Sequence, residues 1–179
     1  MGNFKRDLSR SCLWGEYLLI FVCVGSREYQ FNRLLKEIDR LIEKGQITDE
    51  VFGQIGQSDY IPKNFEYTNF LSNKEFKNMQ QQSNLIISHG GTGALISSLK
   101  MGKQVISVPR LEKYNEHIDN HQLQISQVLT DQGYLLQVLN IKDLINKIIE
   151  IDKNPINKNF KSNSKILDII LEYIERINK

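Results

Sequence analysis

A strand, a glycine-rich turn and a helix are encoded back to back in residues 85–102, and this stretch constrains the fold more than any other. Its first part, Leu85–Ile87, is a continuous β-prone run, typical of a strand that is covered on both faces. The turn Ser-His-Gly-Gly-Thr-Gly follows, and Thr92 is a candidate cap for the next helix. Gly102 is a suitable end for that helix. Its apolar positions share one side: Leu95, Ile96 and Leu99.

This turn is a candidate phosphate site, because the first amides of a helix are unpaired and carry a partial positive charge. Gly90, Gly91 and Gly93 would let a ligand approach the main chain closely. The pattern does not match the dinucleotide fingerprint, since Ile96 stands where a third glycine belongs, and it lacks the Gly-Lys-Ser/Thr ending of a P-loop. On the glycines alone, a tight strand-to-helix turn without a ligand is an equally good interpretation.

A second polar loop strengthens the case for a ligand. Gln104–Val108 predicts another buried strand, which Pro109 closes. Residues 110–122 then gather Glu, Asn, His and Gln side chains, including two of the three histidines of the chain; the third is His89. Loops after the carboxyl ends of neighbouring parallel strands meet at one edge of a sheet, where such sheets bind ligands. A phosphate turn beside a loop rich in hydrogen-bonding side chains suits a sugar nucleotide.

Strands and helices alternate along the chain, which predicts the α/β class: a single Rossmann-like domain with a mainly parallel sheet flanked by helices. The expected strands are Tyr17–Val24, Glu50–Ile55, a weaker Tyr67–Leu71, Leu85–Ile87, Gln104–Val108 and Tyr134–Val138. The expected helices are Phe31–Lys44, Asn73–Gln82 capped by Ser72 or Asn73, the helix from Thr92, Asp119–Gln132, Asp143–Lys153 and Ser164–Asn178.

We divide the chain into three parts on this basis. Residues 1–16 are an N-terminal extension that we expect to be disordered, and residues 17–154 form the nucleotide-sugar-binding domain. Residues 155–179 contain a C-terminal amphipathic helix, which packs on the sheet or docks a partner.

The net charge, the cysteines and the apolar runs of the chain argue against several classes of function. Among 179 residues, 23 Lys and Arg face 21 Asp and Glu, and the net charge of +2 is too balanced to indicate nucleic-acid binding. Cys12 and Cys23 form neither a metal-ligand spacing nor a disulfide framework, as in a reducing cytoplasm. The longest apolar run, Tyr17–Val24, is shorter than the ~20 residues of a membrane helix. It suits a buried strand better than a signal peptide.

Two motifs together resemble a known family. The turn Ser-His-Gly-Gly-Thr-Gly and the run Pro-Arg-Leu-Glu-Lys-Tyr-Asn-Glu-His-Ile-Asp-Asn-His-Gln look like the carboxyl-terminal, donor-binding half of GT-B glycosyltransferases of family 28. The likeness extends over about residues 18–144, and the second motif is the more restrictive one. It is greatest to the single-domain catalytic subunits of two-chain enzymes. These include bacterial capsular and exopolysaccharide glycosyltransferases and the related catalytic subunit of the dolichol-pathway N-acetylglucosaminyltransferase.

The resemblance implies an inverting transferase that uses a UDP-sugar donor without a metal or other cofactor, with galactose as our first choice and a β-linkage in the product. It also implies a polyprenyl-linked saccharide acceptor and a separate, membrane-anchored subunit that binds it. The chain would then act in the cytoplasm, at the inner face of the cytoplasmic membrane. The alternative is a non-catalytic nucleotide-sugar-binding or scaffold subunit that assists another transferase. A fragment of a UDP-sugar epimerase is a weaker third interpretation.

The motifs and the resemblance together assign residues to the parts of the donor. We expect the diphosphate at Gly25, Ser26, His89, Gly90, Gly91, Thr92 and Gly93. We expect the sugar at Glu116, His117, Asn120, His121 and Gln122. We expect uracil and ribose at Phe70, Leu71 and Ser97. Ordinary turn or core roles are the alternative for the residues outside the two motifs.

The proton-accepting group and the ribose contact are less well defined by the sequence. Glu28 and Glu116 are the candidate catalytic carboxylates, and a solvated surface glutamate is the alternative for Glu28. Relatives place an acidic residue for the ribose hydroxyls eight positions after the turn histidine. This chain has Ser97 there, so its ribose contact must differ.

Histidine spacing raises a metal site as a competing interpretation. His117 and His121 stand four residues apart, which is half of a zinc motif. Ile118 occupies the position where His-Glu-x-x-His needs its glutamate, and no third ligand is apparent. We therefore expect no metal.

Overall fold

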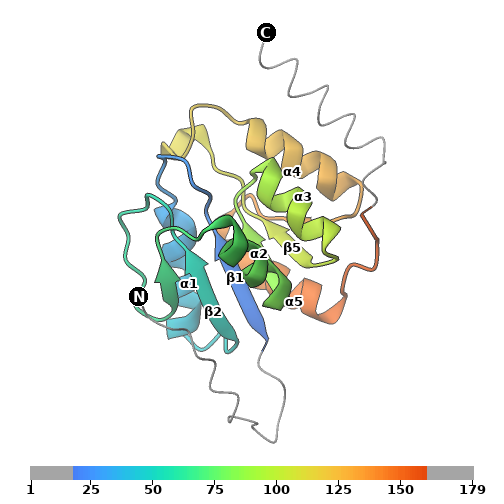
Figure 1. The fold of residues 1–179 in the computed structure, drawn as a ribbon, viewed down its shortest axis with the longest axis horizontal. Helices are drawn as coiled ribbons and strands as arrows, with labels where there is room; N and C mark the ends of the chain where they lie inside the picture. The colour runs from blue at the N-terminus through green and yellow to red at the C-terminus, as the bar shows by residue number, and fades with distance from the viewer. Residues whose placement is uncertain (1–17, 161–179) are drawn as a thin grey trace, which may run out of the picture.

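Strand β1 (Leu19–Cys23) lies in the middle of the sheet because all five of its residues are apolar and buried. The computed structural model describes residues 18–160, whose strands form one six-stranded sheet covered by helices (Figure 1). The other strands are β2 (Glu50–Gln54), β3 (Glu66–Thr68), β4 (Leu85–Ser88), β5 (Gln104–Ser107) and β6 (Leu136–Gln137). The helices are α1 (Asn32–Glu43), α2 (Asn73–Gln82), α3 (Thr92–Lys100), α4 (His121–Asp131) and α5 (Leu144–Lys153). Short 3-10 helices span Glu112–Tyr114 and Ile141–Asp143.

The strand order creates a topological switch point beside β1. All neighbouring strands are parallel, in the order β3-β2-β1-β4-β5-β6. From β1 the chain winds outward to β2 and β3, and then returns to place β4 on the other side of β1. At this junction the last residues of the two strands, Cys23 and Ser88, are paired in register. Open α/β sheets bind ligands at such a reversal, so the predicted fold is confirmed together with the place where a site belongs.

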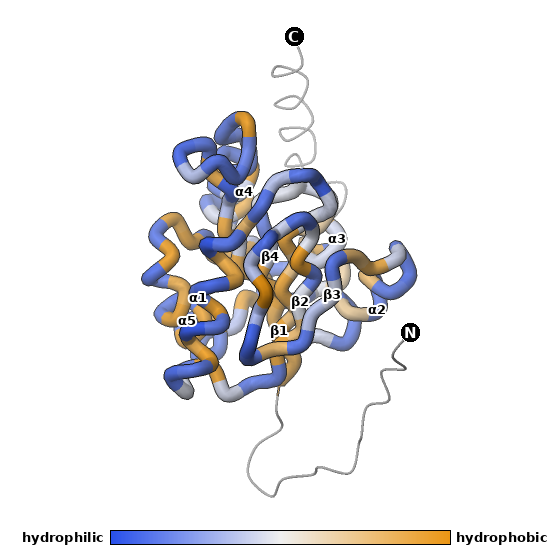
Figure 2. The backbone as a smooth tube through the Cα atoms, turned by 90° about the vertical axis from the view of Figure 1, so that its left-hand side faces the viewer, coloured by the Kyte–Doolittle hydropathy of each residue, from blue (hydrophilic) through white to orange (hydrophobic). Residues whose placement is uncertain are grey.

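Helices cover both faces of the sheet because side chains alternate along each strand. The side that faces α1 and α5 carries four fully buried aliphatic residues: Ile20, Val22, Ile87 and Ile106. On the opposite side, Phe21 packs edge-on against Phe76 of α2, with ring centroids 5.3 Å apart. Val105 lies in a further core cluster with residues of α3 and α4. Figure 2 shows α1 and α5 on one side of the strands and α2 and α3 on the other.

The start of α3 differs from the sequence prediction. Gly91 is the N-cap residue, with extended backbone angles of φ −73° and ψ 123°, and Thr92 is already helical. The prediction that Thr92 caps this helix is therefore wrong, and the turn ends one residue earlier than expected. By contrast, Ser72 caps α2 as predicted, in a reciprocal capping box with Glu75.

One helix and two strands also have other bounds than predicted. Helix α4 begins at His121, because the Asp119 carboxylate accepts the His121 amide hydrogen and holds a turn before the helix. Strand β3 ends at Thr68 and does not reach Leu71, whose amide donates to the side chain of Gln54 at 3.2 Å. Strand β6 contains only residues 136–137, inside the longer strand that we expected.

Some sequence predictions fall outside the described part of the chain. These are the N-terminal extension at 1–16, Tyr17 of the first strand and the helix Ser164–Asn178. Among residues 18–160, the structure contains no helix with the length and apolar character needed to cross a membrane.

The capping box of α2 gives a stability prediction. Ser72→Ala removes the oxygen that accepts the Glu75 amide hydrogen, so we expect the free energy of unfolding to fall by about 1 kcal/mol. Urea unfolding measures this difference. Lys77→Ala, at an exposed position of the same helix, is the control and should change stability by less than about 0.5 kcal/mol. Equal effects of the two substitutions would contradict the capping role.

Candidate functional site

Three loops meet at the carboxyl edge of the sheet, after β1, β4 and β5. The loop after β1 contacts the turn after β4, since a Cβ atom built on Gly25 would lie 2.6 Å from His89 Nε2. The turn after β4 contacts the segment that follows β5, since a Cβ atom on Gly90 would lie 2.7 Å from Gln122 Cβ. The structure therefore brings together the predicted diphosphate residues and one end of the predicted sugar loop.

The His89 ring lies between two glycines of the predicted diphosphate site. A Cβ atom on Gly91 would lie 2.2 Å from His89 Nε2, and Gly25, on the other side, adopts a positive φ of 87°. Both glycines are thus required by the packing of the imidazole, whether or not a ligand binds. This explains two glycines that the sequence analysis assigned to phosphate contacts.

The His89 ring is neutral at physiological pH. Burial lowers its pKa to about 4, and the nearby positive charge of Arg110 lowers it as well. Its Nδ1 atom lies 3.3 Å from the carbonyl oxygen of Cys23, which can only accept a hydrogen bond. We therefore place the proton on Nδ1 and leave Nε2 without one. In this state the ring shapes the turn but has no charge to offer a phosphate, and its predicted contact with the diphosphate remains a prediction.

The amino end of α3 presents unpaired amides to the switch point. Leu95 is the first residue whose amide donates within the helix, to the carbonyl oxygen of Gly91. The amides of residues 92–94 come before this bond, and they carry the partial positive charge of a helix start. A Cβ atom on Gly93 would have no neighbour within 4 Å, and the residue is exposed. The position of Gly93 is therefore open on this side, and helix starts of this kind bind anions.

Glu116 has a structural role that the sequence did not suggest. Its side chain is 0% exposed and forms two hydrogen bonds of 2.9 Å with the guanidinium group of Arg33. One of its oxygens also accepts the Leu111 amide hydrogen at 3.0 Å. Because both oxygens are occupied inside the protein, this geometry does not support the predicted sugar-binding or catalytic role. Glu116 instead fastens the loop after β5 to helix α1.

Arg110 is a buried cation behind the same loop. The residue is 1% exposed, and its Nη2 donates to the carbonyl oxygen of Tyr29 at 2.9 Å. Its amide donates to the side chain of Gln122 at 3.3 Å, which places this predicted sugar residue with its oxygen turned inward. Burial lowers the pKa of Arg110 to about 10, although the Glu116 carboxylate acts in the opposite direction. The guanidinium group therefore remains charged at physiological pH.

The predicted uracil and ribose residues lie after β3 and on α3. Phe70 is 46% exposed, and its carbonyl oxygen accepts from the Thr68 hydroxyl. The Leu71 amide, by contrast, already has the Gln54 side chain as its partner. Ser97 accepts a hydrogen bond of 2.7 Å from Gln80, and its hydroxyl lies 3.1 Å from the carbonyl oxygen of Ala94. In this conformation Leu71 and Ser97 contribute to helix packing, and only Phe70 is open to a base.

Other predicted residues lie at the rim of the site. Ser26 and Glu28 are exposed in the bend after β1, where the structure provides Glu28 with no special environment for a catalytic base. Asn120 accepts the Glu112 amide hydrogen at 3.2 Å and lines an open cavity together with Leu111 and other residues of the same loop.

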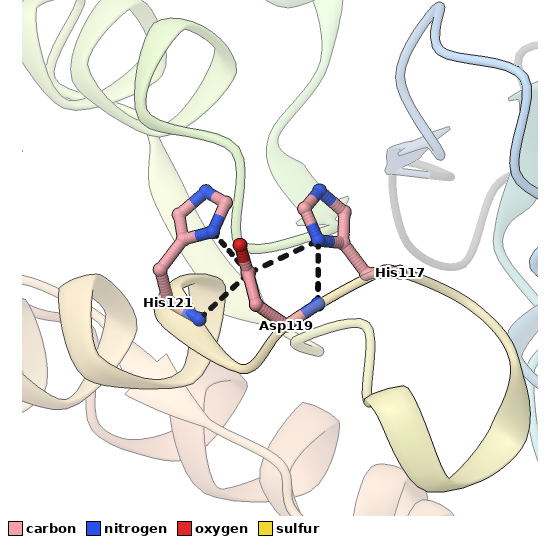
Figure 3. Close-up of side chains that lie close together, drawn as sticks. All are labelled: His117, Asp119 and His121. Atoms are coloured by element: carbon pink, nitrogen blue, oxygen red, sulfur yellow. Dashed lines mark hydrogen bonds and ion pairs between the residues drawn. The ribbon is translucent and has the colours of Figure 1, made fainter. Parts of the chain in front are cut away.

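Two histidines and an aspartate converge immediately before α4 (Figure 3). His117 Nδ1 lies 3.1 Å from Asp119 Oδ1, and His121 Nδ1 contacts the same oxygen. The possible ligand atoms of all three residues lie within 4.8 Å of one another. Burial lowers the pKa of His117, while Asp119 acts to raise it. One part of the sequence argument against a metal was the lack of a third ligand, and Asp119 supplies a side chain of that kind.

Sequence reasoning missed three residues that organise this edge. Arg33 gave no local signal, and Arg110 was visible only as a member of the second motif, because the partners of both side chains are distant in the sequence. Asp119 was visible, since it lies two residues from each histidine, but a helix predicted from Asp119 onward would point it away from His117.

A parallel sheet whose strand order reverses beside a helix start is a doubly wound, Rossmann-like fold, and the nucleotide-binding half of GT-B glycosyltransferases has this fold. The sequence profile of the glycosyltransferase family 28 C-terminal domain matches residues 19–176, and the chain therefore belongs to this family.

Individual relatives agree with this assignment. The UDP-N-acetylglucosamine transferase subunit ALG13 of Candida albicans is 34% identical over 90 residues, which are 50% of this chain and 27% of that protein. The mouse protein of the same name is 31% identical over 87 residues, which are 46% of this chain and 7% of that protein. An NMR solution structure of ALG13 has a TM-score of 0.53 at 19% identity and covers 90% of this chain and 94% of that one, a likeness in fold. The chain spans less than a third of the length of the two curated relatives.

The partly buried His89 ring gives a pH prediction. In the unfolded chain its pKa is the ordinary 6.5, whereas in the folded chain the pKa is about 4, so between these values the unfolded state binds the proton more readily. The stability that this group confers is present above pH 6.5 and is lost as the pH falls toward 4, by on the order of 3 kcal/mol.

Urea unfolding at about pH 7 and about pH 4.5 measures this loss, and His89→Gln should remove that part of the pH dependence. The amide of glutamine can still donate to the Cys23 carbonyl oxygen. A stability difference between the two pH values that is the same in both proteins would contradict the neutral, buried assignment of His89.

Proposed function

We propose that this chain is the donor-binding subunit of a UDP-sugar glycosyltransferase and that the amides of residues 92–94 hold the diphosphate. The observation that carries the proposal is the contrast among the glycines of the site. Gly25, Gly90 and Gly91 each face a side chain that a Cβ atom would strike, whereas nothing lies within 4 Å of a Cβ atom on Gly93. Protein packing explains the first three glycines, so close approach of a ligand is the remaining reason for the fourth.

The chemistry follows from where negative charge grows during transfer. As the bond between the sugar and the diphosphate breaks, UDP leaves with increasing negative charge, which amides at the start of α3 stabilise. Arg110 adds a fixed positive charge in a buried position near His89, where water screens it weakly. These groups act on the leaving group. The group that takes the proton of the acceptor hydroxyl is a separate requirement, and the buried Glu116 does not meet it.

We further propose that the acceptor side of the active site comes from another polypeptide. The described residues form one Rossmann-like sheet, while a GT-B site lies between two such units, and relatives of this chain are named as subunits. In our proposal this partner is membrane-anchored, binds a polyprenyl-linked saccharide and holds the chain at the inner face of the cytoplasmic membrane. Neither nucleic acid nor a cofactor has a part in the proposed reaction.

The identity of the sugar is a separate proposal. The relatives are named as UDP-N-acetylglucosamine transferase subunits, so we now place N-acetylglucosamine first. Galactose, our first choice from the resemblance to capsular enzymes, becomes the main competitor, with a capsular or exopolysaccharide product. Inversion to a β-linkage belongs to the same proposal for either sugar.

A non-catalytic role is the second candidate function. Ser97 replaces the acidic ribose residue of relatives and is already paired with Gln80, and Glu116 is sequestered by Arg33. Both features favour a subunit that binds a nucleotide sugar while another chain performs the transfer. Both candidate functions predict that the chain binds the donor. Only a measurement of turnover therefore distinguishes them.

A pair of glycine substitutions tests the diphosphate site. Gly91→Ala should lower the free energy of unfolding by about 1–3 kcal/mol, because the new methyl group strikes the His89 ring. Gly93→Ala should leave stability unchanged or raise it by up to about 1 kcal/mol, because alanine favours a helix. The same substitution should weaken UDP binding by about tenfold or more, since the methyl group obstructs the amides. Calorimetric titration with UDP measures the affinity, and unchanged affinity in Gly93→Ala would refute the proposed diphosphate site.

A panel of donors tests the function itself. Thermal melting with UDP-N-acetylglucosamine, UDP-galactose, UDP-glucose and UDP-glucuronate should show the largest rise in melting temperature with the first, because a ligand of the native state stabilises it. UDP release is then measured with the partner subunit and a lipid-linked acceptor. Release supports the catalytic proposal, and binding without release supports the scaffold role. A panel without any shift would refute both.

A further inference from the structure

The cluster before α4 gathers three side chains that can ligate a metal, and two of them, His117 and His121, are also predicted contacts of the donor sugar. It consists of His117, Asp119 and His121, which come from five consecutive residues and point toward one another (Figure 3). We propose that these three residues bind a divalent transition-metal ion such as Zn²⁺. The inference is independent of the proposed transferase function.

The spacing of the donor atoms suits such an ion. Zinc takes imidazole nitrogen and carboxylate oxygen at about 2.0–2.2 Å, so neighbouring ligand atoms in a tetrahedral site lie about 3.3 Å apart. His117 Nδ1 and Asp119 Oδ1 are 3.1 Å apart, close to this value, and His121 Nδ1 contacts the same oxygen. The possible ligand atoms of the three residues all lie within 4.8 Å of one another, which is the range that a single ion can span after side-chain adjustment.

Short contacts hold the possible ligand atoms of the cluster together. His117 Nδ1 lies 3.1 Å from Asp119 Oδ1, and the Asp119 amide nitrogen lies 3.4 Å from the same ring nitrogen. A metal ion would replace the proton that the imidazole and the carboxylate share, because an unprotonated imidazole nitrogen is the form that binds metals.

The ligand types indicate which class of metal fits. Two imidazoles and one carboxylate suit zinc and neighbouring transition metals, whereas magnesium and calcium prefer oxygen ligands throughout. Three protein ligands leave a fourth coordination position for water or another small ligand. A bound ion would also order the rim of the site, because the Tyr29 ring of the loop after β1 packs against His117 with centroids 5.1 Å apart.

The test is a titration of the full chain with Co²⁺ and Zn²⁺ after treatment with a chelator, in the absence of any nucleotide. Calorimetry should give one ion per chain, and Co²⁺ should develop the visible absorption of a low-symmetry site with nitrogen and oxygen ligands. Asp119→Asn keeps the shape of the side chain but removes the charge, and it should weaken affinity by about tenfold or more. His121→Asn, at a half-exposed position, should have a comparable effect.

Glu112→Gln is the matched control, because it makes the same carboxylate-to-amide change in the same loop but outside the cluster, and it should retain the affinity of the unchanged chain. Thermal melting of the metal-free variants verifies that each is folded. Absence of saturable binding up to about 1 mM metal, or equal affinity in Asp119→Asn and Glu112→Gln, would overturn the proposal. UDP binding measured with chelator present reports on the transferase proposal separately, so failure of one proposal does not affect the other.

Discussion

The packing of the His89 imidazole between Gly25 and Gly91 is the contact on which the rest of this edge depends. It joins the loop after β1 to the turn after β4 at the one place where the strand order reverses. Any side chain at either glycine would displace the ring, and with it the backbone that leads into α3. The contact of the neutral His89 ring with Gly25 and Gly91 therefore sets the direction in which the first amides of α3 point. The ligand-facing geometry thus exists before any ligand arrives, which is the condition for effective electrostatic stabilisation.

Two arginines and one glutamate lie behind the carboxyl edge of the sheet, and the glutamate forms hydrogen bonds with only one of the arginines. Arg33 and Arg110 both lie close to Glu116, but the carboxylate gives its bidentate bonds to Arg33. Arg110 is left with a backbone carbonyl oxygen, and its buried Nε atom has no hydrogen-bond partner among the described residues. A buried cation with incomplete compensation is unfavourable for the isolated protein. It becomes favourable when a diphosphate occupies the adjacent turn, so the same feature that lowers stability would raise affinity for an anion.

The fold was predictable from the sequence because its strands are uninterrupted apolar runs and its helices carry regular apolar faces, as in Leu19–Cys23 and in α5. The glycine turn was predictable as a loop, but the reasons for its glycines were not. Gly91 accommodates the His89 ring from two residues away, and Gly25 accommodates the same ring from the end of another strand, a contact that no local pattern reveals. The loop after β5 was predicted to lie beside the glycine turn, and the contact between Gly90 and Gln122 shows that it does. The role of Glu116 was not predictable, because its pairing with Arg33 depends on how the chain returns to α1.

The pairing of Arg33 with Glu116 also has a consequence for the order of assembly. The two residues are separated by 83 positions in the sequence, and the carboxylate holds the loop after β5 in place through them. Contacts between such distant segments form only after the intervening chain has lost much of its freedom, so they come late during folding. The pairing of β1 with β4 joins residues 65 positions apart, such as Ile20 and Leu85, so the centre of the sheet and the loop after β5 both depend on long-range contacts. A chain that is shortened before Glu116 would keep the partners of β1 but lose the carboxylate that fixes Arg33.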